Sequence, residues 1–401
     1  MNTNNSSILF PILTLIVIFS EQLGHALLIW LNSDAASNIM KYVFMVVAFP
    51  CYCIFFNQVI KYHHSKKIWC TYLILFLIPF LYYLTSVQYA KYTNIPNNYY
   101  SYLLRYCSMS FSACIIGINL SNHPYRQKIE SYLPLFITIF GLTSGSVAIE
   151  SAISGKFINF DSGINYQNIS YALAELYAYC LFYLFFSSKS KENKVMRIII
   201  IFMIFYSSVL CLVSGGRGAA VYMVFISAYI IYWLLRQNII RRKTFVFVAT
   251  LYTCIFIGIL YHFNVFESVG FERITDHISD SSSRDGIFEK SIATIMDSPI
   301  IGHGLGSVWM TVGIYSHNMI MDFLVETGLI GCILLSCIII IIIYKLSKRI
   351  PTNYFHLFIL LVFLKTLIMD MFSSYWISSY QLWFAFGYVI ALPKIKINNH
   401  S

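Results

Sequence analysis

Long apolar stretches follow one another along almost the whole chain, and they constrain its fold more than any other feature. A helix that crosses a membrane needs about 20 largely apolar residues. Only 11% of the residues are charged, whereas a soluble domain averages about 25%. The sequence therefore predicts an all-α polytopic membrane protein, one integral-membrane domain over 1–401, with about twelve transmembrane helices. The expected spans are 8–31, 42–60, 68–87, 100–121, 131–153, 169–187, 198–213, 219–235, 244–263, 317–344, 354–373 and 376–393.

The distribution of lysine and arginine predicts the orientation of these helices. With the N-terminus in the cytoplasm, 18 of the 27 basic residues fall in cytoplasmic loops or the C-terminal tail, and seven fall outside. Basic residues concentrate in cytoplasmic loops. Both termini are therefore expected in the cytoplasm, with one large outward loop over 264–316. The net charge of +10 is interpreted as topology and contact with lipid headgroups, and not as nucleic-acid binding.

Neither the cysteines nor the N-terminus indicates another kind of protein. The ten cysteines are scattered, mostly through apolar spans, and none has the spacing of zinc ligands. We expect no metal, no cofactor and no disulfide. Residues 1–7 carry no basic residue, and the apolar run that follows has no small-residue cleavage site. That run is expected to be a first transmembrane helix and not a signal peptide.

A glycine turn at 214–218, Ser-Gly-Gly-Arg-Gly, joins two expected spans and carries Arg217 on the outer side. Glycine lets a backbone turn tightly and approach a ligand closely. Arginine offers a planar fork of donors that suits phosphate oxygens. Gly216 and Arg217 are therefore candidate binding residues. The alternative is an arginine that reaches lipid headgroups from a helix end.

Arg284 follows three serines on the outer side and precedes a predicted short amphipathic helix over 285–297. Apolar residues recur there at helical spacing, and such a helix would lie along the membrane surface. Its N-terminus beside an arginine would suit an anion. A solvated surface arginine is the alternative.

A glycine-rich run, Gly302-His303-Gly304-Leu305-Gly306, follows that helix. It is no dinucleotide fingerprint, because no strand precedes it and no βαβ unit follows. We expect a flexible loop that can approach a ligand, with His303 and Gly304 as candidate substrate contacts. A solvated histidine is the alternative for His303.

His317 stands at the outer end of an expected span, with Asn318 beside it. An imidazole there can accept a proton near neutral pH, and an interfacial histidine without a task is the alternative. Gly328 and Gly331 on the same expected helix would allow close packing against a neighbouring helix.

Several charged residues fall inside the expected spans, where charges are costly and face a cavity or a partner. Asp322 and Glu326 lie one turn apart, and Lys365 is a candidate partner for one of them. Structural pairing is preferred over catalysis for these residues, and a transporter would use the same residue types. The set is Arg105, Glu150, Glu175, Asp322, Glu326, Lys365 and Asp370.

Taken together, the motifs resemble those of O-antigen ligases and the related, Wzy-type O-antigen polymerases. His317-Asn318 followed after nine residues by Gly328-Leu329-Ile330-Gly331 is similar to one family pattern. The turn at 214–218 and the stretch from Arg284 through Pro299 to Gly304 are similar to two others, in the expected order. The resemblance covers about 210–335, which would be the catalytic region, with the loop 264–316 as the cover of the active site.

The resemblance implies a glycosyltransferase of the bacterial inner membrane with its active site facing the periplasm. The donor would be an undecaprenyl-diphosphate-linked oligosaccharide and the acceptor a glycan hydroxyl. Arg217 and Arg284 would bind the diphosphate, and His317 would activate the hydroxyl. Direct displacement would invert the anomeric carbon, without a metal.

The outer loop looks more like that of polymerases, so polymerase is preferred to ligase, and a chain-length regulator would be a partner protein. A flippase for the same lipid-linked sugars is the more distant alternative. That alternative predicts repeat-related broken helices and no large outer loop. The sequence suggests no such helices, and it does predict a large outer loop.

Overall fold

Every regular element in the part of the chain that the structure describes is a helix. The computed structural model describes residues 9–19, 22–23, 26, 66–121, 126–154, 166–239, 250, 253–254, 256–258, 260–262 and 285–393. The helices are α1 (Leu9–Ile18), α4 (Lys66–Tyr89), α5 (Asn97–Arg105), the π-helix η1 (Tyr106–Ser110), α6 (Phe111–Leu120), α7 (Arg126–Ser154), α8 (Tyr166–Phe186), η3 (Ser188–Lys191), α9 (Lys194–Val213), α10 (Arg217–Arg236), α13 (Asp285–Asp297), α14 (Val308–Thr311), α15 (Met319–Ser347), α16 (Phe355–Phe372), η6 (Trp376–Ser378) and α17 (Tyr380–Ala391).

Eight helical stretches among the described residues are long and apolar enough to cross a membrane. They confirm the all-α, multi-pass class and agree with eight of the expected spans to within a few residues. The expected span 376–393 holds η6 and the 12-residue α17 instead. The stretches are Trp69–Tyr89, Asn97–Leu120, Arg126–Glu150, Tyr166–Phe186, Lys194–Val213, Arg217–Arg236, Met319–Ser347 and Phe355–Phe372.

One expected span, 42–60, falls wholly outside the described residues, and so do parts of two others, 244–263 and the second half of 8–31. The count of twelve and the position of the two termini relative to the membrane therefore stay predictions.

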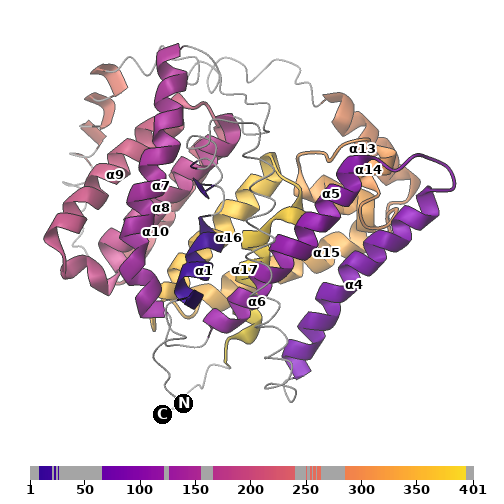
Figure 1. The fold of residues 1–401 in the computed structure, drawn as a ribbon, viewed down its shortest axis with the longest axis horizontal. Coiled ribbons are helices and arrows are strands. Elements are labelled where there is room, and N and C mark those ends of the chain that lie inside the picture. Colours follow the sequence, from indigo (N-terminus) through magenta and orange to yellow (C-terminus); the bar gives the residue numbers. More distant parts are fainter. Residues whose placement is uncertain are drawn as a thin grey trace.

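The helices form two packed groups joined through the centre of the molecule (Figure 1). One core cluster draws on α1, α7, α8, α9, α10 and α16, and the other on α4, α5, α14, the start of α15 and the segment after α16. Helices α6 and α17 lie between them and contribute buried residues to both clusters. At the α6–α17 contact, a Cβ at Gly117 would stand 2.0 Å from the Phe384 carbonyl oxygen. A Cβ at Gly387 would stand 2.2 Å from that of Cys114, so glycines let these two backbones touch.

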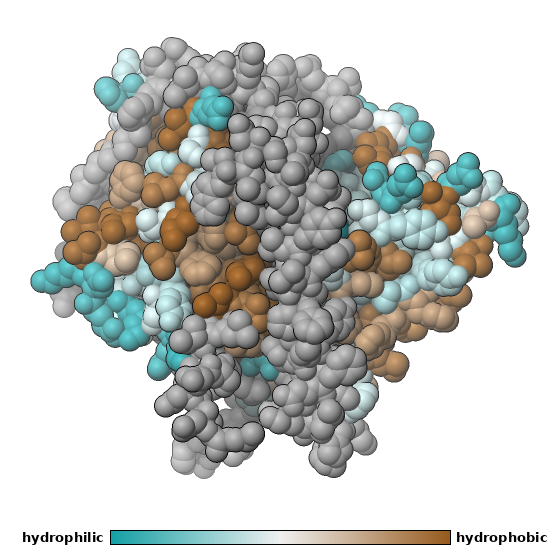
Figure 2. Space-filling view, in the orientation of Figure 1, coloured by the Kyte–Doolittle hydropathy of each residue, from teal (hydrophilic) through white to brown (hydrophobic). Residues whose placement is uncertain are grey.

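Apolar side chains cover much of the described surface. Leu73 on α4, Ile198 on α9 and Val224 on α10 are 68%, 68% and 73% exposed. Figure 2 shows brown, hydrophobic residues at mid-height and teal, hydrophilic ones gathered toward the margins. Such a surface is costly in water and ordinary in lipid.

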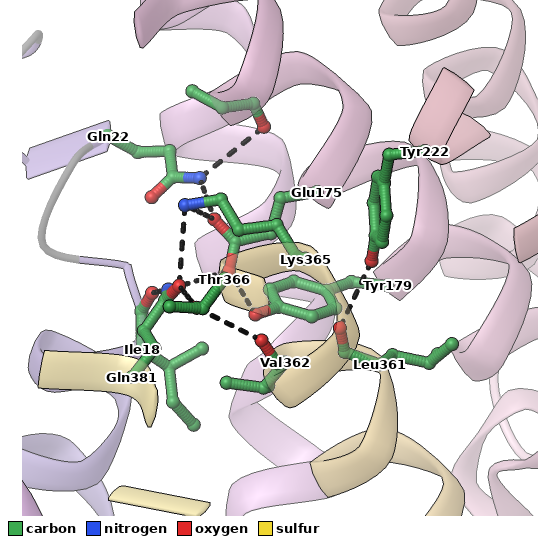
Figure 3. Close-up of polar contacts among 11 residues, drawn as sticks. Ile18, Gln22, Glu175, Tyr179, Tyr222, Leu361, Val362, Lys365, Thr366 and Gln381 are labelled. Atoms are coloured by element: carbon green, nitrogen blue, oxygen red, sulfur yellow. Dashed lines mark hydrogen bonds and ion pairs between the residues drawn. The ribbon is translucent and has the colours of Figure 1, made fainter. Parts of the chain in front are cut away.

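A buried polar network fastens α1, α8, α16 and α17 together (Figure 3). Lys365 Nζ lies 3.6 Å from Glu175 Oε2 and 3.3 Å from Gln381 Oε1. Gln22 Nε2 donates to Glu175 at 2.9 Å, and Gln381 Nε2 donates to it at 2.7 Å. Tyr179 donates to the same carboxylate. The prediction that Lys365 pairs with Asp322 or Glu326 is therefore wrong, because Lys365 lies among the residues of the other core cluster.

Two further charges expected inside spans lie at helix ends. Glu150 is exposed near the end of α7. Asp370 is buried near the end of α16 and accepts a hydrogen bond from the Ser379 hydroxyl, which joins α16 to the start of α17.

Candidate functional site

The predicted helix over 285–297 is confirmed as α13 (Asp285–Asp297). Its apolar residues Ile287 and Ile295 pack against the second core cluster, while Ile292 and Met296 are exposed. Arg284, which directly precedes α13, lies outside the described residues. Its proposed contact with a diphosphate stays a prediction.

Helix α15 is interrupted at Gly328, which has φ 61° and ψ −163°. In a continuous helix the N–H groups of Leu329 and Ile330 would bond to the carbonyls of Val325 and Glu326, four residues back. Here the segment 299–304 takes up all four groups. Leu329 and Ile330 donate to the carbonyls of Pro299 and Ile300 at 2.9 and 3.2 Å. The N–H groups of His303 and Gly304 donate to Val325 and Glu326 at 2.9 and 2.8 Å.

Glycine is required on both sides of this contact. A Cβ at Gly302 would stand 2.5 Å from the backbone of Glu326 and Thr327. A Cβ at Gly328 would stand 2.4 Å from the carbonyl of Ile300. Both residues also have positive φ, which side chains disfavour. The segment 299–304 is thus inserted into the break of α15.

The glycine run approaches the protein's own helices. A Cβ at Gly304 would meet the Thr85 hydroxyl of α4 at 2.6 Å, and one at Gly306 would meet Tyr82 at 2.5 Å. His303 Nε2 lies 2.8 Å from the carbonyl oxygen of Thr294 in α13. Backbone hydrogen bonds from His303 and Gly304 fasten this loop to α15, a feature that the expectation of a flexible loop does not include. Neither substrate contact proposed for His303 and Gly304 is tested by this geometry.

Two other expectations about α15 need correction. The helix is broken, although the sequence suggests no broken helix. Gly328 makes its close contact with the inserted segment and not with a neighbouring helix. A Cβ at Gly331 would meet Thr327 of α15 itself, at 1.8 Å. Among the described helices α15 alone contains a non-helical residue, so it has no counterpart of the kind that inverted repeats of a transporter would provide.

His317 lies in the turn that starts α15. Its φ is 58°, in the left-handed region that a non-glycine residue rarely adopts. Asn318 is the N-cap: its Oδ1 accepts from the N–H groups of Ile320 at 3.0 Å and Met321 at 3.2 Å. The predicted substrate-binding residue Asn318 therefore has a helix-capping role, and its contact with substrate stays a prediction.

The backbone before His317 is held by Asp322. The N–H of Ser316 donates to Asp322 Oδ1 at 2.7 Å, and both residues are fully buried. The Ser316 hydroxyl donates to the Asn318 carbonyl at 2.9 Å and accepts from the Asn318 N–H at 3.2 Å. The turn around His317 is thus closed by local hydrogen bonds on both sides.

Glu326, one turn further along, is held by aromatic residues. Tyr375 donates to its Oε1, and Trp376 Nε1 donates to its Oε2 at 3.2 Å. Burial, and then the charge of Glu326, raise the pKa of the Tyr375 hydroxyl well above its ordinary value, so this group stays protonated and donates. Glu326 therefore joins the first part of α15 to the segment after α16.

The Tyr315 ring packs against His317, and the Tyr102 ring packs against Tyr315. The Tyr315 ring lies 4.3 Å from the His317 ring, centroid to centroid. Tyr102 of α5 lies 6.1 Å from Tyr315, and Arg105 lies over the Tyr102 ring at 5.1 Å. The imidazole is half-buried, which leaves it reachable while aromatic rings shield it.

The glycine turn Ser-Gly-Gly-Arg-Gly at 214–218 packs against the start of α8. Its residue Ser214 hydrogen-bonds Ser170 at 2.8 Å between hydroxyl oxygens. A Cβ at Gly216 would meet Ser170 at 2.4 Å, and one at Gly218 would meet the Tyr171 hydroxyl at 1.9 Å. These glycines therefore allow α8 to approach closely, and the contact of Gly216 with a ligand stays a prediction. Arg217 is exposed, in the first turn of α10.

A short series of contacts connects the two motifs at one end of the helices. A Cβ at Gly218 would stand 3.3 Å from the Phe372 ring, at the end of α16. The next residue, Ser373, accepts from the Tyr315 hydroxyl at 3.2 Å, and Tyr315 touches His317. Arg217 and His317 are thus brought to the same end of the molecule from different core clusters.

Sequence reasoning missed Tyr315, Tyr375 and Trp376. No spacing signal marks them, because the chain contains 31 tyrosines and 6 tryptophans. Among the described residues, no three His, Cys, Asp or Glu side chains come together as metal ligands would.

The family comparison falls on the segment that holds both motifs. Residues 202–336 match the O-antigen ligase family, Wzy_C. The matched segment includes Arg217, Arg284, His303, His317 and Gly328. Proteins of this family transfer lipid-linked glycans, in reactions of the O-antigen ligase and polymerase type. No curated protein gives a significant match to the chain. Residues 202–336 of this multi-pass membrane protein are therefore similar to the O-antigen ligase (Wzy_C) family.

Proposed function

We propose that the protein is an O-antigen polymerase. It would transfer a glycan from undecaprenyl diphosphate to a sugar hydroxyl of an acceptor glycan. The observation that carries this proposal is that Arg217 and His317, from two separate motifs of the matched segment, lie at one end of the molecule and are connected through Phe372, Ser373 and Tyr315.

The residue types at this end suit the reaction. As the bond between the anomeric carbon and the diphosphate oxygen breaks, its electron pair moves onto the leaving diphosphate. Arg217, and Arg284 directly before α13 in the sequence, would stabilise the charge that develops there. The acceptor oxygen attacks the anomeric carbon, and His317 takes the proton of that hydroxyl. Attack opposite to the leaving group inverts the anomeric carbon, and no metal is required for this step.

The proposal includes the topology that the basic residues favour. The helices would cross the bacterial inner membrane many times, both termini would lie in the cytoplasm, and the loop 264–316 would cover a periplasmic active site. The exposed side of α13 (Ile292 and Met296) suits contact with a membrane surface. A chain-length regulator would be the partner protein of a polymerase.

An O-antigen ligase is the second candidate, because the family that matches residues 202–336 is described as O-antigen ligase. Both reactions use the same donor and differ in the acceptor, which would be the core of lipopolysaccharide for a ligase.

Deletion of the gene distinguishes the two candidates on a lipopolysaccharide gel. A polymerase predicts a core that carries one repeat unit, with the ladder of longer chains lost. A bare core, with long chains retained on the carrier lipid, would identify a ligase. An unchanged ladder would contradict both candidates. In purified product, an anomeric configuration equal to that of the lipid-linked donor would contradict inversion.

A further inference from the structure

We infer that Asp322 is a positioning residue for His317: its buried carboxylate holds the backbone turn that presents the imidazole. This inference rests on the proposed function, in which His317 accepts the proton of the acceptor hydroxyl. Asp322 is five residues further along the chain, on the first turn of α15, and the N–H of Ser316 donates to its Oδ1 at 2.7 Å.

The conformation of His317 explains why its turn needs to be held. A residue with a side chain and φ of 58° is in a conformation that persists only where the surroundings enforce it. A change of that backbone would redirect the imidazole. An error of about 1 Å in the placement of a reacting group can reduce a rate by about 100-fold.

Hydrogen bonds on the two sides of His317 have different origins. On the C-terminal side, Asn318 caps α15 through its own side chain. On the N-terminal side, the backbone of Ser316 is fastened to the helix by Asp322. The Ser316 hydroxyl closes the turn across His317, through the Asn318 carbonyl and N–H. Asp322 therefore connects the residue before His317 to α15.

The surroundings of Asp322 argue against a role in an ion pair. The carboxylate is fully buried, and its Oδ2 has no hydrogen-bond partner among the residues that the structure describes. In the described part of the chain it has no cation within 4.0 Å. A buried carboxylate kept only for stability would be expected to have such partners. The contact that Asp322 makes is the one to Ser316, and an asparagine could make it equally well through its own Oδ1.

Three variants of the full-length protein test this assignment. Asp322→Asn keeps the acceptor, Asp322→Leu keeps the branched side-chain shape but is larger and has no acceptor, and His317→Ala removes the imidazole. Each is reconstituted into liposomes with undecaprenyl-diphosphate-linked oligosaccharide, isolated from cells that lack the gene, as the donor and as the acceptor glycan. Thermal unfolding of each variant in detergent is measured alongside kcat and KM.

We expect Asp322→Leu to lower kcat by about 100-fold while KM for the donor stays within about twofold, because the diphosphate contacts are elsewhere. Asp322→Asn should recover more than a third of the wild-type kcat. Equal losses of kcat in Asp322→Asn and Asp322→Leu would overturn the inference, and so would a Leu variant with wild-type kcat.

The design separates this inference from the proposed function. A fully active His317→Ala would remove the proposed base, whatever the Asp322 variants do. An inactive His317→Ala together with a fully active Asp322→Leu would overturn the role of Asp322 alone. If Asp322→Leu does not fold, Asp322→Asn still decides, because a kcat below one tenth of wild type in a folded Asn variant contradicts positioning through the hydrogen bond.

Discussion

Gly328 and Ile300 are in backbone contact: a Cβ at Gly328 would stand 2.4 Å from the carbonyl of Ile300. This contact lies where the segment 299–304 enters the break of α15. The part of α15 before the break carries most of the buried residues of this helix, Asp322 and Glu326 among them. The part from Leu329 to Ser347 is largely exposed and apolar, and by itself it is close to the roughly 20 residues that a span needs. The break thus separates the site-bearing end of α15 from its membrane-crossing part.

Gly328→Ala should prevent this contact. The new Cβ would meet the Ile300 carbonyl, and alanine disfavours the φ of 61° at this position. We expect a loss of about 3 kcal/mol of stability or more, seen as a lower unfolding temperature in detergent, together with loss of transfer activity.

Gly286→Ala is the matched control, because a Cβ at Gly286 in α13 would meet nothing within 4 Å. Alanine is the better helix former by about 1 kcal/mol, so this variant should be at least as stable as wild type. A Gly328→Ala protein with the unfolding temperature and activity of Gly286→Ala would contradict the inserted segment.

Lys365→Met should destabilise the protein. It leaves the Glu175 carboxylate buried beside Gln22, Gln381 and Tyr179 without its cation. Removing one partner of a buried ion pair costs about 3–5 kcal/mol, which should lower the unfolding temperature in detergent by several degrees.

The double variant Glu175→Gln/Lys365→Met tests the pairing itself. A neutral amide at 175 needs no cation and can still accept hydrogen bonds, so stability should return most of the way toward wild type. If the two single losses simply add in the double variant, the two side chains are not coupled.

Arg217→Ala should abolish product while the protein stays in the membrane, and we expect the same of Arg284→Ala and His317→Ala. Arg217→Lys should also fail if Arg217 binds the diphosphate through two parallel N–H donors, because an ammonium group cannot reproduce that fork. The measurement is product formation in membranes with equal amounts of each variant. Full activity of Arg217→Lys would show that only the charge matters.

His303→Ala distinguishes the contact seen in the structure from the one suggested by the sequence. Loss of the hydrogen bond to the Thr294 carbonyl should cost about 1 kcal/mol and leave KM for the lipid-linked donor unchanged. His303→Gln, which keeps an N–H donor, should recover the stability. A rise in KM of tenfold or more in a stable His303→Ala protein would instead assign His303 to substrate.

Much of this molecule could be predicted from the sequence because it depends on local chemistry. Apolar length specifies most of the membrane helices. The helical spacing of Ile287, Ile295 and their neighbours predicts α13. The position of His317 at the start of its helix also follows from the sequence. The family motifs along residues 210–335 are short local patterns, so they can be identified from the sequence. Residues 202–336 match the O-antigen ligase family.

Only the tertiary structure decided how distant segments meet. The presence of Gly328 inside an apolar run does not reveal that the segment 299–304 will take up the helix hydrogen bonds around it. Nor does the sequence reveal that Lys365 will pair with Glu175, 190 residues earlier, instead of Glu326. Those outcomes depend on which backbones can approach each other and which buried charges share a core cluster. The sequence by itself determined which segments are helices and which carry the motifs. The packing of all segments together decided which residues hold the turn at His317, which segment fills the break of α15, and which motifs meet at one end of the molecule.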